Sequence, residues 1–165
     1  MSIILIFKIL TLASCIISSI LVVLTISRRK ESSPLKYYFL LMIAISVYSI
    51  SYLFEISMPR LEWSIYCLNF EYIGLSCIPI CWILIAWSYS PYDIDKDKKT
   101  KNYLYLLFII SLVVSLAVWT NPLHHLIYKD ISLIKTPYNI TILKYDRAFG
   151  FWVANIMLVA LYLIG

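Results

Sequence analysis

Apolar residues occur in five long blocks along the chain, at positions 3–26, 35–56, 65–89, 103–119 and 149–164. The strands of a membrane β-barrel alternate apolar and polar residues over about 10 positions, whereas these blocks are almost continuous. A bilayer core about 30 Å thick needs about 20 apolar residues per helix, with about 17 as the lower limit. The pattern therefore predicts five transmembrane helices, of which the last two are short.

Composition supports a membrane protein. The 165 residues are 62% hydrophobic and 14% charged, against about 45–50% and about 25% in soluble domains. So large an apolar fraction exceeds what one small core can bury. We expect an all-α integral membrane protein, built as a single transmembrane helical domain over residues 1–165.

Basic residues are concentrated in two of the connections between the blocks. Short connections rich in Lys and Arg lie in the cytoplasm. This rule predicts an outside N-terminus and a cytoplasmic C-terminus. The basic residues of the first and third connections are Arg28, Arg29, Lys30 and Lys36, and Lys96, Lys98, Lys99 and Lys101.

The first basic cluster follows the first apolar block, whereas in a cleaved signal peptide it would precede that block. We therefore expect a retained first helix. The net charge of +5 fits contact with anionic lipid head groups. It does not indicate nucleic acid, because no soluble basic face carries stacking aromatic residues.

The connection between the fourth and fifth blocks, at 121–148, is the longest. Connections longer than about 12–15 residues are usually functional or disordered. The stretch ISLIKTPYNITILKY alternates apolar and polar residues around a turn at 136–139. We expect a short β-hairpin or cap here, lying over the outer ends of the helices.

Polar residues gather at one depth, in the outer third of the membrane. Glu71 lies about two turns inside the third helix, where ionisable residues are rare and usually face the bundle interior. A purely structural interpretation of this group is also open. Glu55 and His125 would then be solvated at the interface, and Asn69 and Asn155 would form hydrogen bonds between helices. The other members of this group are Glu55, Asn69, His124, His125 and Asn155.

No enzyme motif occurs in the sequence. The four cysteines have no metal-ligand spacing and fit small buried side chains. His124 and His125 are adjacent, so they point in different directions and do not form a chelating helical pair. We expect no catalytic residues, no metal and no cofactor.

Three motifs occur in a fixed order: FEYIGLSCIPICWILIAWSYS at 70–90, TNPLHHLIY at 120–128 and YDRAFGFWVANIMLVALYLIG at 145–165. Together they resemble the N-terminal seven-transmembrane sensor region of bacterial histidine kinases. Glu55 at the end of the second helix also fits that pattern. The residues that carry the resemblance are Tyr72, Gly74, Pro79 and Trp82, then Thr120, Asn121 and His124, then Phe151 and Trp152.

The resemblance implies a multi-pass sensor of the bacterial cytoplasmic membrane, whose last helix drives a cytoplasmic signalling domain or partner protein. A homodimer is one arrangement that the sequence allows. The sequence departs from the family by having five apolar blocks and no catalytic region, so kinase activity is not carried over. We expect a truncated receptor, a gene fragment or a stand-alone five-helix protein.

We hypothesise that an outer pocket, capped by the long connection, binds a small molecule or peptide. An alternative is a small membrane transporter or transporter subunit, supported by Glu71 and by a third helix interrupted near Pro79. A membrane protein without any ligand is a further alternative. The predicted ligand-binding residues are Glu55, Glu71, Tyr72, Asn121, His124 and Trp152.

Overall fold

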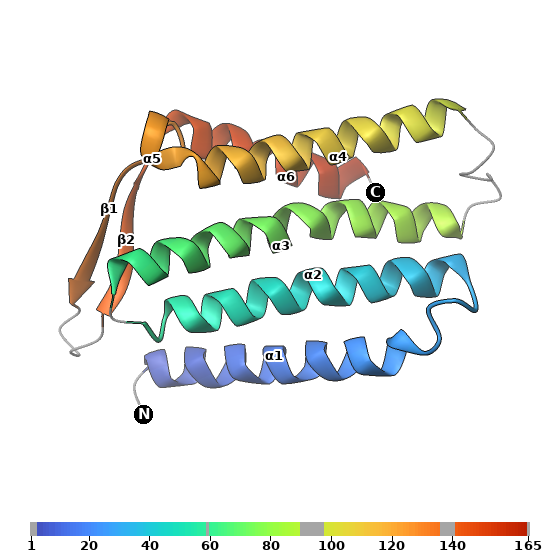
Figure 1. The fold of residues 1–165 in the computed structure, drawn as a ribbon, viewed down its shortest axis with the longest axis horizontal. Helices are drawn as coiled ribbons and strands as arrows, with labels where there is room; N and C mark the ends of the chain where they lie inside the picture. The colour runs from blue at the N-terminus through green and yellow to red at the C-terminus, as the bar shows by residue number, and fades with distance from the viewer. Residues whose placement is uncertain (1–2, 59, 90–97, 136–140, 165) are drawn as a thin grey trace.

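The computed structural model describes residues 3–58, 60–89, 98–135 and 141–164. In these ranges the chain forms six helices and one pair of strands (Figure 1). In chain order they are α1 (Ile3–Ile26), α2 (Ser33–Glu55), α3 (Leu61–Ser88), α4 (Lys98–Trp119), α5 (Asn121–His124), β1 (Tyr128–Lys135), β2 (Thr141–Arg147) and α6 (Phe149–Ile164).

Four helices, α1 to α4, are long and apolar enough to cross a membrane. The fifth predicted helix is present as α6, which has 16 residues. Helices α3 and α4 start at Leu61 and Lys98, before the apolar blocks that begin at 65 and 103. Helical hydrogen bonding continues into polar first turns, so hydropathy alone places both starts too late.

Helix α3 is the centre of the bundle, because α2, α4 and α6 all pack against it. Helix α1 packs on α2 and forms the outermost layer, while α6 lies behind α4 (Figure 1). The start of α1, the end of α2, the start of α3 and the β-hairpin lie at one end of the bundle. The helix ends that border the first and third connections, which are the basic ones, lie at the opposite end of the bundle.

Small residues allow the helices to approach closely. A Cβ atom on Gly74 would lie 2.7 Å from the backbone oxygen of Ala44 and 2.9 Å from the backbone nitrogen of Tyr48. The backbones of α2 and α3 are therefore in direct contact at this point. Helix α3 continues as one helix through Pro79, so the structure removes the interrupted helix that supported the transporter alternative.

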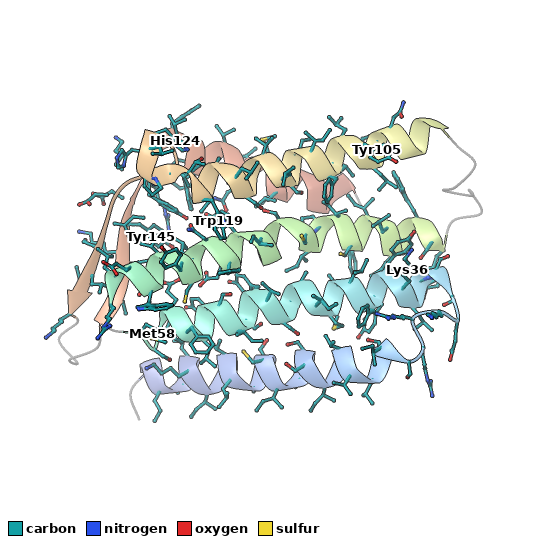
Figure 2. All side chains as sticks on the ribbon, in the orientation of Figure 1. Lys36, Met58, Tyr105, Trp119, His124 and Tyr145 are labelled. Carbon is teal, nitrogen blue, oxygen red and sulfur yellow. The ribbon has the colours of Figure 1, made fainter. Side chains whose placement is uncertain are left out.

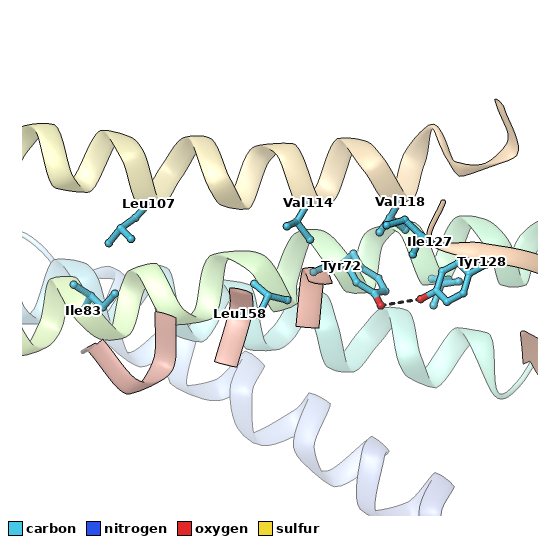
Figure 3. Packing of buried hydrophobic residues seen from close by; sticks show 10 residues of the cluster. Tyr72, Ile83, Leu107, Val114, Val118, Ile127, Tyr128 and Leu158 are labelled. Atoms are coloured by element: carbon cyan, nitrogen blue, oxygen red, sulfur yellow. Dashed lines mark hydrogen bonds between the residues drawn. The ribbon is translucent and has the colours of Figure 1, made fainter. Parts of the chain in front are cut away.

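The main apolar core joins α3, α4, β1 and α6 (Figure 3). It includes Tyr72 and Ile83 from α3, Leu107 from α4 and Tyr128 from β1. Because β1 contributes to this core, the hairpin is packed onto the bundle and is not a detached loop.

Large apolar side chains cover the outside of the bundle, as expected for a surface that faces lipid (Figure 2). A groove of about 660 Å³ runs between α2, α3 and α4, and large apolar residues such as Leu40, Phe108 and Trp119 line it. Lipid chains are the ordinary neighbours of such a surface.

Candidate ligand-binding site at the hairpin end of the bundle

The segment after α5 folds as an antiparallel hairpin of β1 and β2. Its register runs from Tyr128 opposite Arg147 to Lys135 opposite Thr141, with an irregularity between Tyr128 and Asp130. The predicted turn at 136–139 lies outside the described residues. The hairpin occupies the position at which the sequence predicted a hairpin or cap.

Asn121 holds the start of the hairpin. Its Nδ2 donates to the carbonyl oxygen of Tyr128 at 3.0 Å, and its Oδ1 accepts from the backbone N–H groups of Ile127 and Tyr128 at 2.9 and 3.0 Å. The side chain is buried. These bonds occupy most of the hydrogen-bonding capacity of the amide, so Asn121 positions the hairpin.

Tyr128 connects the hairpin to α3. Its hydroxyl donates to the hydroxyl of Tyr72 at 2.8 Å, as Figure 3 shows, and the two rings meet edge to face with centroids 6.4 Å apart. Tyr128 is 1% exposed. Burial raises the pKa of the Tyr128 hydroxyl, and the neighbouring Tyr72 raises it further. The phenol therefore keeps its proton and remains the donor of this bond.

Glu71 is buried within the membrane-spanning part of α3. Tyr66 and Trp87 fit the two interfaces, because at about 1.5 Å per residue they are about 32 Å apart along the helix, close to the thickness of the hydrocarbon core. By the same rise, Glu71 lies about 8 Å inside Tyr66. Glu71 is 8% exposed, and its Oε1 has no hydrogen-bond partner among the described residues.

Glu55, at the end of α2, faces Glu71. The two carboxyl groups lie close enough to influence each other's ionisation. Tyr48 and Tyr52 stack in parallel on α2 with centroids 6.3 Å apart, and both are close to this pair. In the described parts of the chain, neither carboxyl has a Lys, Arg or His partner.

His124 belongs to the turn before the hairpin. Its Nδ1 accepts the N–H of Leu126 at 3.0 Å, and its Nε2 lies 3.1 Å from the hydroxyl oxygen of Thr120. The acceptor role of Nδ1 places the proton of a neutral ring on Nε2, which then donates to Thr120. Both ring nitrogens are thus used within the turn.

Trp152 lies on α6 and is 53% exposed. The guanidinium of Arg147 lies 5.7 Å from its ring centroid and 4.9 Å from that of Phe151. In the described residues, neither Trp152 nor His124 contacts Glu55 or Glu71. The structure thus brings Glu55, Glu71 and Tyr72 to one region of α2 and α3, while Asn121, His124 and Trp152 surround the base of the hairpin.

A separate cavity of about 210 Å³ lies between α3, the end of α4, α5 and β1. Asn121 is the predicted site residue that lines it, and it is His125 rather than His124 that reaches it. Lys129 and Asp130 carry no signal of a site in the sequence, because a Lys–Asp pair in a surface strand is an ordinary solvated pair. The full lining is Ile65, Leu68, Asn69, Val118, Asn121, Pro122, His125, Tyr128, Lys129, Asp130 and Ile131.

Four helices are long and apolar enough to span a membrane, and buried polar side chains lie between them near the hairpin. These features define a multi-pass helical membrane protein. Comparison with known families identifies it further: the family described as the N-terminal 7TM region of histidine kinase matches residues 10–165. The chain belongs to this family. No curated protein and no solved structure matches the chain.

The family assignment confirms the resemblance that the three motifs carried. The chain is a membrane sensor region located in the cytoplasmic membrane, and this region is not itself the catalytic part of a histidine kinase.

Proposed function

We propose that this region detects an extracytoplasmic or membrane-borne ligand at its hairpin end, which faces the outside of the cell. One observation carries the proposal: the buried Glu71 carboxyl, beside Glu55, has an oxygen without a partner among the described residues. Ionisable groups at membrane depth are costly and mark functional sites by default. Glu55, Glu71 and Tyr72 are the proposed ligand contacts.

The remaining predicted residues act by placing the hairpin over this region. Asn121 holds the first residues of β1, His124 orders the turn before it, and Trp152 packs beside Arg147 at its end. A ligand that reaches Glu71 therefore meets a hairpin that is already positioned.

A transmission path follows from the same contacts. The hairpin is bonded to α3 through Tyr128 and Tyr72. The segment just before β1 is bonded to the start of α6, because the Gly150 N–H donates to the Leu126 carbonyl at 2.9 Å. A ligand that favours one hairpin position then also favours one placement of α6 against α3. Only a difference in affinity between the two arrangements produces such a shift.

The test compares Glu71→Gln with Glu62→Gln, a matched change at an exposed position on the same helix. In cells whose histidine kinase carries this region, we expect Glu71→Gln to change basal autophosphorylation by about fivefold or more, the lower range of allosteric coupling. Glu62→Gln should leave it unchanged. Wild-type autophosphorylation in a Glu71→Gln protein present at normal level in the membrane would refute the proposal.

A further inference from the structure

The cavity beside the hairpin is small, and its lining includes polar side chains. Its volume of about 210 Å³ corresponds to about seven water molecules at about 30 Å³ each. Drug-sized ligand pockets begin at about 300 Å³. The cavity therefore suits a molecule with few heavy atoms, such as a single amino acid.

Asn69 is one of the buried polar residues that line this cavity, and the amide of Asn121, another, is engaged with the hairpin backbone. Asn69 is 7% exposed and comes from α3. Its backbone oxygen accepts a bond from Nε1 of Trp119 at 3.3 Å, whereas its side-chain amide has no hydrogen bond among the described residues. Asn69 lines the cavity, and its amide is not one of the fully buried polar atoms that lack a partner, so it is accessible from the cavity. A ligand that both donates and accepts hydrogen bonds would satisfy it.

The walls around Asn69 are apolar. Leu68 from α3, Val118 from α4 and Ile131 from β1 belong to them. Such walls strengthen a hydrogen bond to the amide, because they exclude competing water. They also require an aliphatic portion in any ligand that fills the cavity.

Charges of both signs stand at the rim. Lys129 and Asp130 are exposed, and neither forms an ion pair in the part of the chain that the structure describes. The register irregularity between Tyr128 and Asp130 places both residues at the cavity, since a bulge departs from the alternation of a regular strand. His125 adds a third polar group at the rim.

We infer that this cavity binds a zwitterionic α-amino acid whose side chain ends in an amide or hydroxyl. The side-chain polar group pairs with the Asn69 amide, and its methylene groups contact the apolar walls. The ammonium and carboxylate groups pair with Asp130 and Lys129 at the rim. The binding itself is independent of the proposed function, and only its role as a signal rests on that function.

The experiment measures binding of tritiated L-glutamine to the full chain in lipid nanodiscs. L-Leucine, of similar size without an amide, and propionamide, an amide without the two charges, are the competitors. We expect saturable glutamine binding, with each competitor weaker by about tenfold, the effect of about 1.4 kcal/mol. Equal competition by leucine or propionamide, or no saturation up to about 10 mM glutamine, would overturn the inference.

Asn69→Leu is the decisive variant. It replaces an unpaired amide by an apolar group of similar size, a change that can be neutral or stabilising. We therefore expect unchanged or higher thermal stability together with at least tenfold weaker glutamine binding. If Asn69 had only a structural role, the Asn69→Leu variant would be less stable than the wild type. Unchanged glutamine binding in this variant would contradict the proposal.

Two further variants complete the test. Asn102→Leu changes an exposed asparagine of α4 that does not line the cavity, so glutamine binding should stay at the wild-type level. The double variant Lys129→Gln with Asp130→Asn changes only exposed residues and keeps the test available if Asn69→Leu fails to fold. This double variant should remove the preference for glutamine over propionamide. A retained preference would contradict the pairing of the ligand's ammonium and carboxylate groups with Asp130 and Lys129.

The two proposals fail in different ways. Binding that depends on Asn69 while Glu71→Gln leaves autophosphorylation unchanged would uphold the cavity and reject the signalling site. A change of autophosphorylation in Glu71→Gln without any glutamine binding would uphold the signalling site and reject the cavity as a binding site.

Discussion

The bond between Tyr72 and Tyr128 is the residue-scale contact on which hairpin docking depends. Tyr72→Phe leaves the fully buried Tyr128 hydroxyl without its partner, and an unsatisfied buried hydroxyl costs about 1–3 kcal/mol. We expect this loss of stability in unfolding measurements. Tyr72→Phe combined with Tyr128→Phe should cost less than the sum of the single changes, because no hydroxyl then remains unpaired.

Tyr105→Phe provides the control for that double-mutant cycle, since Tyr105 is exposed on α4. It should change stability by less than about 0.5 kcal/mol. Additive effects of the two single changes would show that the hydroxyl bond does not couple the hairpin to α3.

Sequence could predict that Glu71 lies within an apolar helix and that Glu55 ends the preceding helix, but not the partners of either residue. Which side of each helix faces which neighbour depends on tertiary packing. For this reason Asn121 was predicted as a ligand contact, although its amide is engaged with the hairpin backbone.

At the scale of elements, long apolar runs predicted the spanning helices and strand alternation predicted the hairpin. Both signals come from local periodicity, which one sequence contains. Helix α5 was missed because its four residues, Asn121–His124, are too few for any periodic pattern. Its Pro122 lies in the first turn, where a missing N–H is tolerated.

Gly74 gives the prediction for the pair α2 and α3. Ala is a better helix former than Gly by about 1 kcal/mol, so Gly74→Ala would stabilise an isolated helix. Here the added Cβ would overlap the Ala44 oxygen. We therefore expect a net loss of about 1–3 kcal/mol from overpacking, measured by thermal unfolding in nanodiscs.

Gly150→Ala is the matched comparison, because its Cβ would meet the Leu126 oxygen at 2.6 Å instead. Hydrogen exchange should then increase at the start of the hairpin in Gly150→Ala and along α2 and α3 in Gly74→Ala. Wild-type stability in Gly74→Ala would mean that the two helices are not in backbone contact.

At the scale of the whole molecule, the central position of α3 was beyond prediction. Buried residues occur around most of the circumference of α3, and helices that face lipid are equally apolar. Hydropathy therefore does not distinguish a central helix from a peripheral one. Charge predicted that the first and third connections share one side of the membrane. The structure places the ends of α1 and α3 and the starts of α2 and α4 at one end of the bundle.

Orientation itself remains a prediction, and cysteine labelling tests it. Lys144→Cys on β2 and Ser32→Cys before α2 introduce exposed thiols at opposite ends of the bundle. A membrane-impermeant maleimide should label Lys144→Cys in intact cells and Ser32→Cys only after permeabilisation. The wild-type protein is the background control, because its four free cysteines are buried or half-buried. The opposite labelling pattern would invert the predicted topology.

The hairpin also marks where the hydrocarbon ends. In the described residues its sheet has only two strands, so each strand has one side whose N–H and C=O groups lack a strand partner. Unpaired edges of this kind do not occur in contact with lipid tails. Each edge must therefore meet water or protein and not lipid tails, so the docked sheet limits how deeply this end of the bundle sinks into the bilayer.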